Sequence, residues 1–74
     1  MSEAKFLLEL AFQIKKARLK AGKTQAQVYD AIGIHVGRIE QGKHSIHVTT
    51  LVNLANYFKT NPVELIPKKF LLND

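Results

Sequence analysis

Histidine is the residue of this chain that most readily suggests chemistry, because an imidazole can bind a metal ion or carry a proton. The three histidines are His35, His44 and His47, and the last two are three positions apart. The chain has no cysteine, and no carboxylate completes an evident ligand set with these histidines. We therefore expect no metal site. His47 is instead expected at the N-cap of a following helix, in the place usually held by Ser or Thr.

Hydrolysis is the second chemistry that the residue types suggest. Ser45, a histidine and Asp30 include the groups of a nucleophile, a base and an acid. The sequence around Ser45, however, has neither a nucleophile turn nor an oxyanion loop. Thiol nucleophiles are excluded because cysteine is absent. We expect no enzymatic activity and no cofactor.

Positive charge is the third feature, and it is concentrated near the N-terminus. The net charge of the 74 residues is +5, of which residues 1–23 contribute +4. No acidic residue interrupts the basic segment from Lys15 to Lys23. Such a surface attracts nucleic acid, because binding releases the cations held by the phosphate backbone. A solvated helix face with a basic C-terminal end would have the same composition, so charge alone leaves both interpretations open.

The composition is that of one small globular domain. Hydrophobic residues make up 46% of the chain and charged residues 23%, a composition that indicates neither a disordered chain nor a membrane span. A length of 74 residues is sufficient for one core only, so residues 1–74 are expected to form a single domain. The absence of cysteine is compatible with a reducing compartment, and we expect a cytoplasmic protein without membrane contact.

Two helices are predicted in the first half of the chain. Apolar residues recur at spacings of three and four from residue 4 to residue 21, which predicts one buried helical stripe ended by Gly22. Phe6, Leu8 and Phe12 lie partly off that stripe. Thr24 and Gln27 have the spacing of a capping box, so a second helix is expected to begin there and to end at Gly33.

Three shorter helices are predicted in the second half. The pattern favours helices over residues 34–41, 48–58 and 62–66, with Gly42 ending the first of these and Pro67 ending the last. Asn61 and Pro62 supply an N-cap and a first helical residue for the 62–66 segment. The tail from residue 67 to 74 contains Phe70, Leu71 and Leu72, and we expect it to pack on the first helix or on a partner. No strand is predicted, so the fold class is all-α.

The order of these residues resembles the Cro/repressor-type helix-turn-helix family, also called XRE-like. The resemblance covers about residues 10–66, and its sharpest parts are Thr24-Gln25 and Arg38-Ile39-Glu40-x-Gly42. It implies a compact five-helix, lambda-repressor-like domain. Residues 34–41 would then be the recognition helix in the DNA major groove, with the preceding helix crossing the backbone.

The resemblance also implies roles for individual residues. Arg18 and Glu40 are expected to form a structural ion pair. Gln25 is expected to contact a DNA phosphate at the start of the second helix, where free amide groups favour an anion. The full set of expected DNA-contacting residues is Thr24, Gln25, Gln27, His35, Gly37, Arg38, Lys43 and His44.

The chain departs from the family pattern between Gly33 and Glu40, where it is about three residues short. With the end of the recognition helix as anchor, the residues facing bases become Ile34, His35, Gly37 and Arg38. This set has few hydrogen-bond donors, so low specificity, or specificity carried by the following loop, is expected. Gly33 and Gly37 are expected to allow the two helices to pack closely.

Two functional hypotheses follow. The first is a repressor-like transcription regulator that binds double-stranded DNA as a homodimer, and within it an antitoxin that binds a toxin through its apolar ends. The second is a protein interaction module that keeps the fold and has lost specific DNA recognition. Under the first, the dimer interface would come from the last two helices or from Phe6, Leu8, Phe70, Leu71 and Leu72.

Overall fold

The computed structural model describes residues 2–71, and these form four α-helices and two short 3-10 helices. The α-helices are α1 (Glu3–Lys20), α2 (Gln25–Ile32), α3 (Val36–Ile39) and α4 (Val48–Phe58), and the 3-10 helices are η1 (Pro62–Leu65) and η2 (Lys68–Phe70). The described residues contain no strand, so the all-α class is confirmed. The expected number of five α-helices is wrong, because residues 62–66 do not form one.

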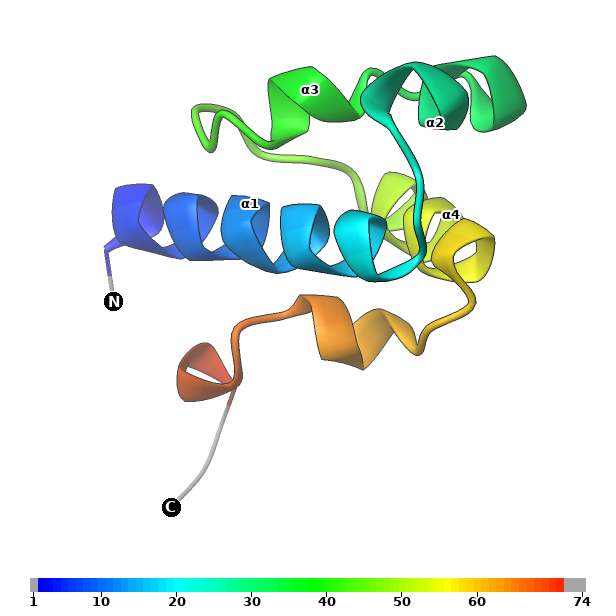
Figure 1. The fold of residues 1–74 in the computed structure, drawn as a ribbon. Coiled ribbons are helices and arrows are strands. Elements are labelled where there is room, and N and C mark those ends of the chain that lie inside the picture. The colour runs from blue at the N-terminus through cyan, green and yellow to red at the C-terminus, as the bar shows by residue number, and fades with distance from the viewer. Residues whose placement is uncertain (1, 72–74) are drawn as a thin grey trace.

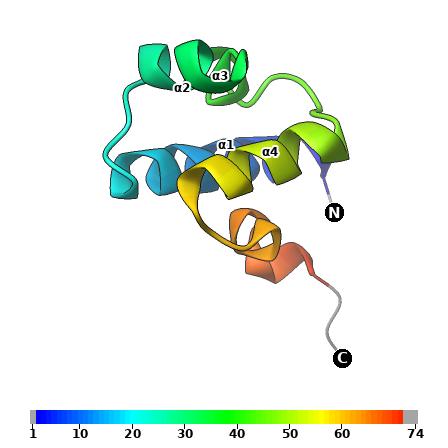
Figure 2. The same cartoon turned by 90° about the vertical axis from the view of Figure 1, so that its right-hand side faces the viewer.

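The elements form three layers. Figures 1 and 2 show α2 and α3 above α1 and α4, with η1 and η2 on the opposite side. One fully buried side chain from each of the first five elements meets in the core: Ile14, Val28, Val36, Leu54 and Leu65. The core therefore ties the α2–α3 layer to α1.

The boundaries of the first two helices follow from local capping. The Ser2 hydroxyl accepts a hydrogen bond from the Lys5 amide, so α1 begins one residue before the expected start. α2 begins after the Thr24 cap, as expected, and ends at Gly33 with φ 70°. This left-handed conformation is favourable for glycine and costly for other residues.

The third helix is shorter than expected. α3 comprises only four residues, and the expected helix over 34–41 is too long at both ends. At its start, Ile34 packs against the core and His35 has ψ 76°, outside the helical region. At its end, Gly42 adopts φ 70° and ends the turn.

The fourth helix has the expected bounds, and the next segment does not continue as an α-helix. η1 begins at the Asn61 cap, whose side chain accepts a hydrogen bond from the Val63 amide. Pro67 disfavours helical geometry at the residue before it, and Ile66 is extended with φ −88° and ψ 127°. Only one turn therefore forms, and it is of the 3-10 type.

The tail lies against the N-terminal half of α1. The rings of Phe6 and Phe70 meet edge to face with centroids 5.3 Å apart, and Lys69 forms an ion pair with Glu9 at 2.7 Å. Leu71 is exposed, and Leu72 lies outside the described residues. The tail thus contacts the first helix, one of the two placements expected from its apolar residues.

Candidate nucleic-acid interface

The start of α2 is held by a capping box. The Thr24 hydroxyl oxygen accepts a hydrogen bond from the Gln27 amide at 3.0 Å, and the Gln27 carbonyl oxygen accepts one from the Thr24 amide at 2.8 Å. Both side chains belong to the set expected to contact DNA. Their side-chain oxygens already accept hydrogen bonds from backbone amides of this helix end. A phosphate would therefore be bound by the remaining N–H and O–H donors at the start of α2.

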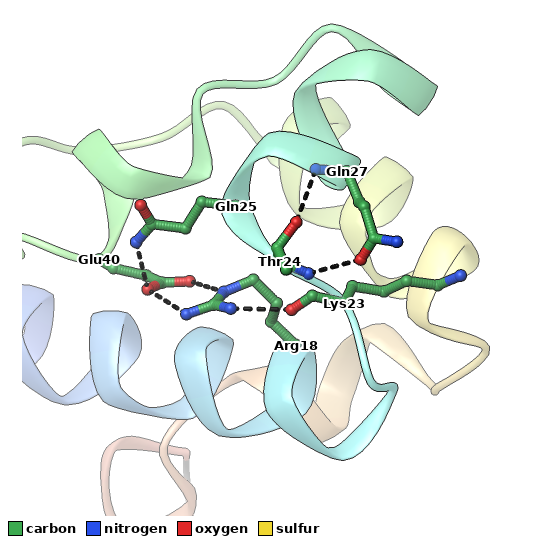
Figure 3. Close-up of polar contacts among 6 residues, drawn as sticks. All are labelled: Arg18, Lys23, Thr24, Gln25, Gln27 and Glu40. Atoms are coloured by element: carbon green, nitrogen blue, oxygen red, sulfur yellow. Dashed lines mark hydrogen bonds and ion pairs between the residues drawn. The ribbon is translucent and has the colours of Figure 1, made fainter.

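A buried ion pair joins α1 to the end of α3. The Arg18 Nε donates to Glu40 Oε2 at 2.6 Å, and its Nη2 donates to Glu40 Oε1 at 3.1 Å. The side chains are only 8% and 5% exposed. Arg18 Nη1 also donates to the backbone carbonyl of Lys23 at 2.8 Å (Figure 3). The two residues that the family resemblance pairs therefore lie together.

Hydrogen bonding to Glu40 is the main reason that the pKa of Arg18 is raised above its ordinary value. Burial opposes this effect, because it disfavours the charged guanidinium. Arg18 thus stays protonated at any pH at which the protein would be studied. The positive charge beside Glu40 is therefore permanent.

Gln25 extends the same network to α2. Its Nε2 donates to Glu40 Oε1 at 3.0 Å (Figure 3). A side chain at Gly37 would bring its Cβ to within 2.9 Å of Gln25 Oε1, so glycine allows α3 to approach this side chain closely. The close approach expected of Gly37 is thus present between the helices. Gly33 does not contribute to it, since a Cβ there would meet nothing within 4 Å.

The structure changes the set of residues that face outward on the short α3. Ile34 packs against the core, so its side chain is not turned outward as expected. Gly37 lies beside the Gln25 side chain. Arg38 and His35 are exposed. His35 occupies the N-cap of α3 without a side-chain capping bond, and its ring stacks on Tyr29 at 4.3 Å between centroids.

The loop after α3 carries the remaining expected contacts. Lys43 and His44 are exposed, and His44 lines a shallow hollow together with Arg38. Ser45 in this loop donates to Glu3 Oε2 at 3.3 Å, which connects the loop to the start of α1. Figure 1 shows α2, α3 and this loop following one another along one side of the molecule. We call this side the α2–α3 face.

Sequence reasoning missed two contacts at this face. Neither the Tyr29–His35 stack nor the Gln25–Glu40 hydrogen bond was expected from the sequence. His47 does occupy the N-cap of α4, but its side chain makes no capping hydrogen bond. The only advance signal was Gly37 within a helix, which indicates a close neighbour.

No group of three or more His, Cys, Asp or Glu side chains among residues 2–71 is placed to hold a metal ion. None of the helices described is long and apolar enough to cross a membrane.

Comparison with known proteins identifies the family. A family model described as helix-turn-helix matches residues 14–65, which is more than half of the chain. The chain therefore belongs to the Cro/repressor-type, or XRE, helix-turn-helix family that its sequence resembles. This is a family of DNA-binding transcription regulators. The searches of curated proteins and of solved structures found no match to the chain.

Proposed function

We propose that this protein is a transcriptional repressor that binds double-stranded DNA with its α2–α3 face and carries out no chemistry. The observation that carries the proposal is the helix-turn-helix match over residues 14–65. The geometry supports it, because Arg38, Lys43 and His44 are exposed on α3 and the loop that follows it. These side chains can donate to phosphates or base edges.

The position of α3 in this proposal is fixed by the Arg18–Glu40 pair. Both residues are used for structure. Gln25 could reach a phosphate with the second hydrogen of Nε2, or it could exchange its bond with Glu40 for one with the phosphate. Such an exchange is inexpensive, because Gln25 is exposed and replaces one hydrogen bond by another. The contact set that we propose remains Thr24, Gln25, Gln27, His35, Arg38, Lys43 and His44, with Gly37 serving the approach of α3 to α2.

We further propose that the repressor acts as a homodimer on a palindromic site in the cytoplasm. Two copies of α3 must lie about 34 Å apart to enter successive major grooves on one side of DNA. Exposed apolar residues suited to an interface include Val48 and Val52 on α4 and Val63 on η1. An antitoxin that represses its own operon is a special case of this function, in which the apolar residues of the ends would bind the toxin.

Fluorescence anisotropy tests the DNA-binding face. Labelled DNA from upstream of the coding region and random duplex DNA are titrated with the protein at two salt concentrations. We expect preference for the upstream DNA, and a slope of log affinity against log salt of about −0.9 for each phosphate contacted. Arg38→Ala combined with Lys43→Ala should weaken binding and flatten this slope by up to about 1.8.

Lys68→Ala is the matched control, because Lys68 is an exposed cation in η2, on the other side of the molecule. Circular dichroism should show that all these variants are folded. Unchanged affinity in the double variant would contradict the assignment of this face.

A second function is favoured by the length of α3. With four residues and Arg38 as its one charged side chain, α3 offers little for base recognition. The alternative is therefore a protein interaction module without specific DNA binding. A folded protein that binds no duplex DNA at low salt would select this alternative.

A further inference from the structure

One face of α1 carries exposed apolar side chains along most of its length. Leu8, Phe12 and Leu19 are 59%, 64% and 58% exposed. Their spacing of four and seven residues places them on one stripe of the helix, and Lys15 fills the intermediate position with its long aliphatic stem. We call this stripe, with its flanking lysines, the outer face of α1. Single exposed apolar residues are common, but an aligned set of large ones suggests a binding surface.

The outer face is predominantly basic, and Glu64 of η1 lines a hollow beside two of its lysines, Lys16 and Lys20. The exposed lysines on and beside the stripe are Lys5, Lys15, Lys16 and Lys20. α1 contains only two acidic residues, and both are engaged elsewhere. Glu3 accepts a hydrogen bond from Ser45, and Glu9 is paired with Lys69 of the tail.

The rest of the domain borders this face without covering it. Ile14 and Leu10 turn into the core, and Arg18 turns toward α3. The tail contacts α1 at Phe6 and Glu9. Figures 1 and 2 show α1 between the α2–α3 layer and the η1–η2 layer. Leu8, Phe12 and Leu19 remain more than half exposed in this arrangement.

We propose that the outer face of α1 docks an acidic amphipathic helix of a protein partner. Apolar side chains repeated every three to four residues on that helix would cover Leu8, Phe12 and Leu19. Flanking carboxylates would pair with the lysines and speed association. The charge pattern favours this occupant over a second copy of the chain, because two copies would bring the lysines of both outer faces together.

The same surface is poorly suited to DNA. Phosphates would attract the lysines, but they would leave Phe12 and Leu19 in contact with water or with charged groups. The proposal does not rest on DNA binding, because Leu8, Phe12 and Leu19 are not among the proposed DNA contacts. Of these three, Leu8 borders the loop at Gly42, next to Lys43. A regulator could therefore hold a partner on α1 while its α2–α3 face stays on DNA.

The test uses the full chain labelled with 15N and two synthetic helical peptides. Each peptide has about 18 residues, or five turns, with leucines at i, i+4, i+7 and i+11. The acidic peptide has glutamate at the flanking positions, and its matched control has lysine there. We expect the acidic peptide to shift amide signals of α1 near Leu8, Phe12 and Leu19, and the lysine peptide to bind at least about tenfold more weakly.

Substitutions test whether the acidic peptide binds to the outer face of α1. Phe12→Ser should weaken binding of the acidic peptide by at least about tenfold, because a large aromatic anchor is lost. Val63→Ser is the matched control, since Val63 is 52% exposed on η1, away from this face. Phe12→Ser should keep the DNA affinity of the parent protein, so failure of this proposal and failure of the DNA-binding proposal are distinguishable.

Several results would overturn the proposal. One is equal binding of the two peptides, and another is signal shifts that map outside α1. A third is self-association in sedimentation that Phe12→Ser abolishes, which would assign the face to a second copy. Binding to phosphatidylserine vesicles without binding to the acidic peptide would assign it to an anionic lipid surface.

Discussion

Replacing Arg18 by Met tests how the α2–α3 face is held in place. The side chain of Met retains most of the aliphatic stem and removes the guanidinium. Glu40 then loses both bonds from Arg18 and keeps only the one from Gln25 Nε2 at 3.0 Å. The Lys23 carbonyl loses its side-chain donor as well. A carboxylate that is 5% exposed would thus be left without a neutralising charge.

The expected cost is large relative to the total stability. Removing one partner of a buried ion pair costs about 3–5 kcal/mol. A chain of this length has a free energy of unfolding of about 4–11 kcal/mol. We therefore expect the Arg18→Met variant to lose at least about a quarter of the stability of the parent protein. Weak DNA binding should follow from partial unfolding of α3.

The double variant Arg18→Met, Glu40→Leu provides the decisive comparison. It removes the stranded charge and leaves mainly the unsatisfied Lys23 carbonyl, which costs about 1–3 kcal/mol. It should therefore be more stable than the Arg18→Met variant alone. Urea denaturation followed by circular dichroism, at fixed protein concentration, measures all four proteins of the cycle. A cost below about 1 kcal/mol for Arg18→Met, or additive effects of the two changes, would refute the reasoning.

Two further predictions concern how α1 is packed. Gly22 and Gly42 both have positive φ, but only a Cβ at Gly42 would meet α1, 3.1 Å from the Leu8 Cα. Gly42→Ala should therefore lower the free energy of unfolding by about 1 kcal/mol or more beyond the loss caused by Gly22→Ala. Urea denaturation measures both losses. Equal losses of stability in these two variants would show that the loop containing Gly42 shifts to accommodate the added methyl group. Phe70→Ala should cost about 1–2 kcal/mol through the lost ring contact, whereas Lys69→Ala should cost less than about 1 kcal/mol because Lys69 is 55% exposed. A larger cost for Lys69→Ala than for Phe70→Ala would mean that the Lys69–Glu9 ion pair, and not the aromatic contact, holds the tail on α1.

Features set by nearby residues could be predicted from the sequence. The Thr24–Gln27 capping box depends on residues three apart, and α4 depends on one apolar stripe within a single helix. Both appear in the structure with the expected start or bounds. The 62–66 segment was assigned the wrong helix type, because the effect of Pro67 on Ile66 competes with a good N-cap at Asn61. The helix type of a one-turn segment cannot be predicted from the sequence when the residues at its two ends favour different backbone geometries.

Contacts between elements were harder to predict. The Arg18–Glu40 pair joins residues 22 positions apart, and only the family resemblance indicated it. The Tyr29–His35 stack and the Gln25–Glu40 bond depend on the angle between α2 and α3, which a single sequence does not specify. The same is true of α3 itself, whose first expected residue, Ile34, is drawn into the core.

The short α3 limits how this protein can distinguish DNA sequences. Four helical residues extend about 6 Å, which spans fewer than two base-pair steps of about 3.4 Å. Arg38 is the one side chain of α3 suited to a bidentate base contact, and one such contact discriminates by about 1–3 kcal/mol. Most of the affinity must then come from phosphate contacts, and most of the specificity from the pairing of two half-sites or from the Lys43–His44 loop. We therefore expect binding that depends steeply on salt and only modestly on the sequence of one half-site.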